Sequence, residues 1–217
     1  MKNTDNMTDL DRLREIALDQ YGYVTAGQAE GEGVSRFSLA ALARRGRIER
    51  DSRGLYFMPQ VTDGLRGPLM RAVLWAGEER AVLSHETALD LYGVCDINPI
   101  AIHVTVPKGQ RISKAGGDGI TLHHENLLPS QTEWWHRIPT VRLKDAIRQC
   151  IEWGTSAYLV RQAIDNSRMQ HLISNEEAGA LEKMLDERGS ETGGGRTDLK
   201  AWTALRLKPR SRVPPEY

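Results

Sequence analysis

The stretch from Gly33 to Met58 reads G-V-S-R-F-S-L-A-A-L-A-R-R-G-R-I-E-R-D-S-R-G-L-Y-F-M. Ser35 stands at a helix N-cap position ahead of a run rich in leucine, alanine and arginine, and Gly46 supplies the stop. Two short runs of strand-forming residues follow, at 48–50 and 55–58, with a turn containing glycine between them. The stretch therefore predicts a helix followed by a hairpin of two short strands.

Two further helices are predicted upstream of this stretch. Residues 9–22 carry apolar side chains at helical spacing and end in a glycine. Thr25 and Gln28 have the spacing of a capping box, in which a hydroxyl and an amide bond the free backbone groups at a helix start. Gly31–Gly33 fits a tight turn into the next helix. The order helix, helix, helix, hairpin predicts a winged helix-turn-helix.

Positive charge is concentrated on this segment. The whole chain has 29 lysines and arginines against 29 aspartates and glutamates, so its net charge is zero. Between residues 33 and 60 six arginines stand against two acids, Glu49 and Asp51, which is a local net charge of +4. Any attraction to nucleic acid must therefore come from this local excess and not from the total.

The helix predicted between Ser35 and Gly46 is the candidate reader helix, the one that would enter a groove of DNA. A helical wheel divides it into two faces. Leu39, Leu42 and Ala43 share one face and should pack on the first two helices. The opposite face should turn toward solvent, where it can reach a groove of DNA. Its members are Phe37, Ser38, Ala41, Arg44 and Arg45.

The candidate contacts follow from how a helix fits the major groove, where its first residues touch base edges and flanking cations hold phosphates. Candidate base contacts are Arg36, Phe37, Ser38 and Ala41. Candidate phosphate contacts are Arg44, Arg45 and Arg47, while Arg53 at the hairpin tip would enter a minor groove or hold the backbone. Two alternatives stay open: such a unit can mediate protein contacts only, and a small rotation of the helix would make Phe37 a core residue.

The rest of the chain is predicted to be a second, mixed region. Pro59 and residues 62–64 have the composition of a linker. Strands are expected at 100–106 and 120–123, joined as a hairpin through the glycine-rich residues 116–119. Helices are expected at 65–76, 84–92, 141–153, 157–168 and 175–188, the last capped by Ser174 and ended by Gly189.

These elements predict an α+β fold: an N-terminal winged helix-turn-helix followed by a mixed α/β region with C-terminal helices. The expected domains are residues 1–62, which bind DNA, and residues 63–189, an effector region. Residues 190–217 are glycine-rich, proline-rich and basic, and this composition predicts a tail that is mobile unless it docks.

Several short motifs fail as chemistry. His85-Glu86 begins a zinc-protease pattern, but Leu89 stands where the second histidine ligand must be. His123 and His124 are strand neighbours, so their side chains should point to opposite faces and not converge on one metal. His85 is instead expected at the surface or in a domain contact, and Trp134-Trp135 in the core or an interface. The sequence therefore predicts no catalytic residue, no metal and no cofactor.

Composition bounds the location. No apolar run approaches the ~20 residues that would span a bilayer, and the first nine residues lack the apolar core of a signal peptide. The two cysteines, Cys95 and Cys150, have no metal-ligand spacing and predict no secreted disulfide scaffold. We therefore expect a cytoplasmic protein without membrane partners.

Four stretches together resemble the AbiEi family of antitoxins, each in the same order and at similar spacing. The first is residues 33–56, and the others are L-S-H-E-T-A-L-D-L-Y-G-V at 83–94, I-H-V-T-V-P at 102–107 and I-P-T-V-R-L-K-D-A-I at 138–147. The resemblance spans roughly residues 9–188. The glycine-rich basic tail matches no part of it.

This resemblance implies an antitoxin of a type IV toxin-antitoxin system linked to phage defence. The winged helix of such a protein binds inverted repeats in its own promoter and represses the operon, and its C-terminal domain helps to neutralise a nucleotidyltransferase-like toxin, in some members without a stable complex. The implied operator-reading positions here are Ser35 to Arg45 together with Arg53. Residues 65–188 would be the antitoxin region.

Two other functions remain open. The chain can be a stand-alone transcription factor whose larger region senses a ligand or a partner. It can also be a nuclease-like effector that uses the winged helix for targeting. A neighbouring toxin gene would favour the antitoxin, and metal-dependent cutting of DNA would favour the effector.

Overall fold

The computed structural model describes residues 7–62, 64–77, 80–113 and 115–192. Its N-terminal part contains three helices and a three-stranded sheet. The helices are α1 (Asp9–Asp19), α2 (Ala26–Gly31) and α3 (Arg36–Arg44), and the strands are β1 (Tyr23–Thr25), β2 (Glu49–Ser52) and β3 (Leu55–Phe57). The three predicted helices and the hairpin are all present. Strand β1, which the sequence did not predict, pairs with β3 and places it between β1 and β2.

Local capping explains why the helices begin where they do. The Thr25 hydroxyl accepts a hydrogen bond from the backbone amide of Gln28, and the Gln28 side chain accepts one from the backbone amide of Thr25. At α3, the Ser35 hydroxyl accepts from the backbone amide of Ser38 at 3.1 Å. These bonds satisfy donors that the first turn of a helix leaves without intrahelical partners.

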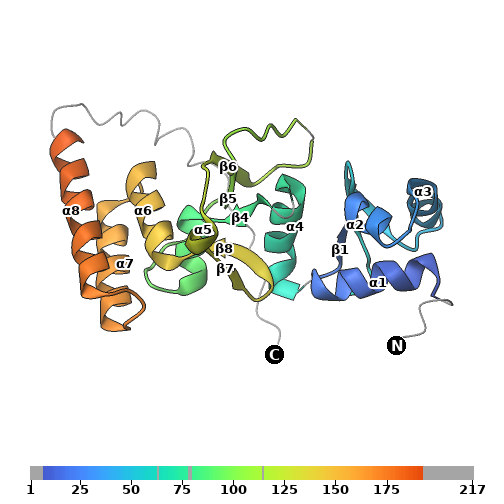
Figure 1. Cartoon of the computed structure of the whole chain (residues 1–217), viewed down its shortest axis with the longest axis horizontal. Helices are drawn as coiled ribbons and strands as arrows, with labels where there is room; N and C mark the ends of the chain where they lie inside the picture. The colour runs from blue at the N-terminus through green and yellow to red at the C-terminus, as the bar shows by residue number, and fades with distance from the viewer. Residues whose placement is uncertain (1–6, 63, 78–79, 114, 193–217) are drawn as a thin grey trace, which may run out of the picture.

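The small sheet is apolar on both faces. Val24 and Tyr56 are paired across β1 and β3 and pack with the three N-terminal helices. Tyr23 and Leu55 face the other way, into the cluster formed with helix α4 (Gly67–Ala76). The winged helix is therefore packed directly against α4, which follows residues 59–62 and the 3₁₀ turn η2 (Gly64–Arg66). Figure 1 shows the arrangement, with α1 to α3 at one end of the molecule and α4 beside them.

A second, five-stranded sheet forms the middle of the molecule. Its spatial order is β6-β5-β4-β8-β7, with β6 at Ile120–His124, β5 at Ile102–Val106, β4 at Val82–Leu83, β8 at Ile138–Val141 and β7 at Thr132–Trp135. The 3₁₀ turn η4 (Pro129–Gln131) precedes β7. The sequence predicted only β5 and β6.

Strands β5 and β6 run parallel, so the predicted hairpin between them is wrong. Parallel neighbours need a crossover of about a dozen residues or more, and the glycine-rich connection at 107–119 is long enough to provide it. The connection usually contains a helix, but its described residues contain none. It rises instead as a loop beside the β2–β3 hairpin (Figure 1).

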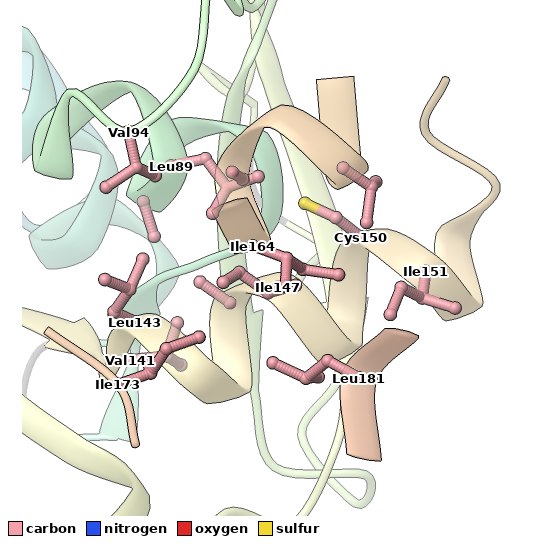
Figure 2. Packing of buried hydrophobic residues seen from close by; sticks show 14 of the residues in the cluster. Leu89, Val94, Val141, Leu143, Ile147, Cys150, Ile151, Ile164, Ile173 and Leu181 are labelled. Atoms are coloured by element: carbon pink, nitrogen blue, oxygen red, sulfur yellow. The ribbon is translucent and has the colours of Figure 1, made fainter. Parts of the chain in front are cut away.

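Four helices pack at the far end of the sheet. They are α5 (His85–Tyr92), α6 (Leu143–Trp153), α7 (Ala157–Met169) and α8 (Asn175–Thr192). Figure 2 shows their core, in which Leu89 of α5, Ile147 of α6, Ile164 of α7 and Leu181 of α8 meet. Helix α8 runs past Gly189, so the predicted stop there is wrong.

The fold is therefore α+β, as the sequence predicted, with the winged helix first and the helices last. The predicted tail, residues 190–217, begins within α8, and its residues beyond Thr192 lie outside those that the structure describes. Cys95 is half-buried, Cys150 is buried, and neither forms a disulfide. None of the helices described is both long enough and apolar enough to cross a membrane.

Candidate nucleic-acid interface

Helix α3 is fixed by one apolar side and leaves the other in solvent. Leu39 is fully buried, and Leu42 and Ala43 are half-buried against the same cluster, as the helical wheel predicts. On the outer side Phe37 is 88% exposed. Arg44 and Arg45 are also exposed. The helix therefore presents an aromatic ring near its start and two guanidinium groups at its end.

Small residues lie between these exposed groups. Ala40 is exposed, although the wheel did not assign it outward, and it lies one turn from both Phe37 and Arg44. Ala41 and Ser38 are only half-buried, at the edge of the same face. This part of the helix offers no bulky side chain, so another surface can approach its backbone closely. The i, i+3, i+7 spacing from Phe37 was the available signal for Ala40.

Two predicted contact residues are engaged within the protein. The Arg36 side chain forms an ion pair with Glu30 of α2, although it remains mostly exposed. The Ser35 hydroxyl caps α3 and lies 3.2 Å from the Ser38 hydroxyl. Arg36 must leave Glu30 to reach a base edge.

The β2–β3 hairpin and the turn that leads into it carry three exposed arginines: Arg47 in the turn, and Arg50 and Arg53 in the hairpin. Gly54 at its turn has a φ of +79°, a conformation that glycine adopts without steric cost. One of the two acids of the hairpin is paired, because Arg71 of α4 donates to the Asp51 carboxylate at 2.7 Å. The other, Glu49, is exposed beside the arginines, so the hairpin carries a smaller excess of exposed positive charge.

The same contact attaches the hairpin to the crossover loop. Arg71 also donates to the carbonyl of Gly116 at 2.9 Å, and the indole of Trp75 donates to the carbonyl of Ala115 at 3.0 Å. A methyl group added at Gly117 would lie within 3 Å of the Trp75 ring. This loop thus depends on a glycine where it crosses the indole.

A cavity of about 600 Å³ opens between the winged helix and this loop. Arg36, Arg50 and Arg53 line it from the winged helix, and Arg111 lines it from the loop at 107–119. Arg50 and Arg111 were not among the predicted contacts. Arg50 lies in the basic segment, whereas nothing local to Arg111 indicates that the fold brings it beside the hairpin.

Three expectations outside this surface need correction. His85 was expected at the surface or in a domain contact, but it is buried beneath α6 because its backbone amide and ring both bond inward, to Gln149 and Ser84. Trp134 was expected in the core or an interface; it is 75% exposed on the edge strand β7, which excludes the core and leaves the interface as a prediction. Its neighbour Trp135 is half-buried below the Arg66 guanidinium, at 5.3 Å.

The expectation of no metal-ligating group also meets contrary geometry. His123 is buried and His124 exposed, so the two do point to opposite faces. His123, however, meets His85 and His103, and one ring nitrogen of each lies within 4.8 Å of the others. Sequence distance hid this cluster, because its members come from one helix and two strands.

The comparisons with known proteins match the winged helix. Residues 11–59 match the family model AbiEi_4, described as "Transcriptional regulator, AbiEi antitoxin". No curated protein matches the chain. A solved structure, that of the RV2827C protein from Mycobacterium tuberculosis, is 16% identical, with a TM-score of 0.46 over 84% of this chain and 78% of that one. The resemblance drawn from the sequence is thus confirmed over residues 11–59, which match the AbiEi antitoxin family of transcriptional regulators.

Proposed function

We propose that the chain binds promoter DNA through α3 and the β2–β3 hairpin, represses its own operon and counteracts a nucleotidyltransferase-like toxin. The winged helix, proposed as residues 1–62, reads inverted repeats. The region at 63–189 acts as the antitoxin. This activity takes place in the cytoplasm, where the promoter is.

The exposed arginines carry this proposal. Within the described residues, Arg44, Arg47 and Arg53 form no ion pair, so their charge is available to phosphates. DNA binding gains much of its free energy when such cations release the counterions condensed on phosphate groups. Two surfaces on one face, a helix end and a hairpin, match the way a winged helix grips a major groove and the adjoining backbone.

The remaining predicted contacts divide into those with bases and those with phosphates. We assign Phe37 and Ala41 to contacts with thymine methyls, and Ser38 to a contact with a base edge. Arg36 would exchange Glu30 for guanine, and Ser35 holds the first turn that positions them. Arg45 adds a further phosphate contact. Arg50 and Arg111 join the surface through the cavity beside the hairpin.

The test is fluorescence anisotropy on the operon's own promoter across a series of salt concentrations. Arg44→Ala and Arg53→Ala should each weaken binding and lower the slope of log affinity against log salt by about 1, because each removes one phosphate contact. The control is Arg161→Ala, which removes an exposed arginine from α7, paired there with Asp186. Equal slopes in all four proteins would contradict the proposal.

The antitoxin activity is tested separately, by expressing the chain together with the product of the adjacent toxin gene. Growth should resume when the full chain is present. The same rescue is expected from Arg44→Ala expressed from an unrelated promoter, because the reader surface then has no role. Continued arrest with both proteins would contradict the antitoxin function while leaving DNA binding intact.

A further inference from the structure

Three histidines meet in the interior, far from the reader helix. His85 is the first residue of α5, His103 lies in β5 and His123 in β6. The parallel register pairs His123 with Thr105, two residues after His103, so both imidazoles lie on the same face of the sheet. All three are buried, and one nitrogen of each ring lies within 4.8 Å of the other two.

The separations suit a single ion. Nδ1 of His103 and Nε2 of His123 lie 2.9 Å apart, and the His85 ring stacks on His123 with 3.5 Å between centroids. Imidazole nitrogens around tetrahedral zinc stand about 3.3 Å apart, given Zn–N bonds of about 2.0–2.1 Å. That spacing lies between the observed 2.9 Å and the 4.8 Å limit. Binding would require the stacked His85 ring to turn its nitrogen edge toward the ion.

The outer nitrogens are oriented by a second layer of polar groups. Nδ1 of His85 lies 3.0 Å from the Ser84 hydroxyl, and Nε2 of His103 lies 3.8 Å from the Glu86 carboxylate. The other oxygen of Glu86 accepts a hydrogen bond from the Thr155 hydroxyl at 2.9 Å. A carboxylate behind a histidine is the usual support of a metal-bound imidazole, because it fixes the ring and raises its basicity.

The positive charge of Arg148, close to the cluster, is balanced by acidic side chains. Arg148 faces His85, where its charge would oppose a metal ion. Its guanidinium, however, is held by Glu125 at 2.5 Å and by Glu152 at 2.8 Å. The local charge is therefore not prohibitive for a divalent ion.

The backbone also holds His85 in an uncommon state. Its φ is +50°, in the left-handed region, and its amide donates to the Gln149 side chain at 3.3 Å. A non-glycine residue adopts this conformation only when its surroundings compensate for the cost, and such positions concentrate at functional sites.

The Trp153 side chain covers one side of the cluster. The Trp153 ring meets all three imidazoles edge-on, with centroids 4.6 to 6.1 Å away, and is itself 53% exposed. The indole therefore covers the cluster and is placed to report on what binds there.

We propose that His85, His103 and His123 bind one divalent transition-metal ion of the zinc class. Three imidazoles and no thiolate select borderline metals such as Zn²⁺ or Co²⁺ over the oxygen-preferring Mg²⁺ and Ca²⁺. Three protein ligands leave one tetrahedral position for water or an exogenous ligand. The ion would join α5 to β5 and β6 and so stabilise the region that follows the winged helix, independently of the DNA-binding proposal.

The first test uses the full chain, stripped with a chelator and dialysed against Zn²⁺ or Co²⁺. One ion per chain should remain, and the Co²⁺ form should show the intense visible bands of tetrahedral coordination. His103→Ala and His123→Ala should lose the ion, while His124→Ala, next in sequence but exposed, should keep it. A wild-type chain that retains no Zn²⁺ and gives no tetrahedral Co²⁺ spectrum would overturn the proposal.

Two milder variants guard against loss of folding. Glu86→Gln should weaken Zn²⁺ binding by about 10- to 100-fold, since it removes the negative charge behind His103 and keeps an amide oxygen that can accept from Thr155. Trp153→Phe should keep the ion but lose the quenching of indole fluorescence by bound Co²⁺. Unchanged affinity in Glu86→Gln, together with unchanged quenching in Trp153→Phe, would place any bound metal elsewhere on the chain.

Discussion

The two ends of this molecule keep their polar chemistry in opposite places. The winged helix buries few polar side chains, and arginines such as Arg44 and Arg53 are exposed to solvent. The region beyond it buries imidazoles and other polar side chains, among them Gln149 of α6. The exposed groups can change with little effect on folding, whereas the buried ones are part of what holds the larger region together.

The largest expected effect lies in the helical core. Ile147→Ala removes a fully buried side chain from the cluster shared by α5 to α8, so it should lower the free energy of unfolding by about 2–5 kcal/mol. Urea unfolding followed by circular dichroism measures the change. Leu172→Ala, at a half-exposed position, should cost under about 1 kcal/mol. Equal losses in both would mean that this core is not where the stability resides.

The next largest effect is expected at the N-cap of helix α3. Ser35→Ala removes the hydroxyl that accepts from the Ser38 amide, so it should cost about 1 kcal/mol in unfolding free energy. Ser35→Gly should cost only a few tenths, about 0.3 kcal/mol, because glycine is tolerated at this position. Thermal unfolding of the two variants side by side gives the comparison. An alanine variant as stable as the glycine variant would contradict the cap.

A smaller effect depends on pH. The pKa of Glu177 is lowered by its hydrogen bond from the Ser174 amide and then by Lys144. The unfolded chain therefore takes up this proton first, and the stabilisation is present above the ordinary value of 4.5 and is lost as the pH falls. Glu177→Gln should be less stable than the wild type at pH 7 and equal to it in acid. A difference that persists unchanged in acid would exclude this cause.

The smallest expected change in stability is at the reader arginines. Arg44→Ala should shift the unfolding free energy by no more than about 0.5 kcal/mol, because the side chain is exposed and forms no ion pair within the described residues. The same protein should bind promoter DNA more weakly. Urea unfolding and anisotropy on one preparation separate the two effects. A loss of stability comparable to that of Ile147→Ala would show that Arg44 belongs to the fold.

Signals that lie within a few residues were predictable. Thr25 with Gln28, and Ser35 with Ser38, announce their helices because donor and acceptor are close in sequence. The outward position of Arg44 follows equally from helical spacing around Leu39. For this reason the winged helix and its candidate contacts could be predicted, with Ala40 and Arg50 as the nearest omissions.

Features that depend on distant pairing were not. Strand β1 is three residues long, and its partner β3 lies beyond two helices, so no local alternation marks it. The parallel pairing of β5 and β6 depends on tertiary packing, whereas the glycines between them favoured a hairpin. The three histidines of the cluster likewise come together only when helix α5 packs against β5 and β6. Local sequence patterns carry no information on such tertiary contacts.

The sheet of β1, β2 and β3 has apolar residues on both faces, and this limits how the reader can move. Two copies seated on an inverted repeat would be spaced by the shape of the described part of the chain, since there the winged helix packs directly against α4. Binding would then depend strictly on the spacing between the two half-sites of the operator. Adding about 5 base pairs between half-sites, half a turn of the duplex, would carry the second copy to the opposite side of the DNA.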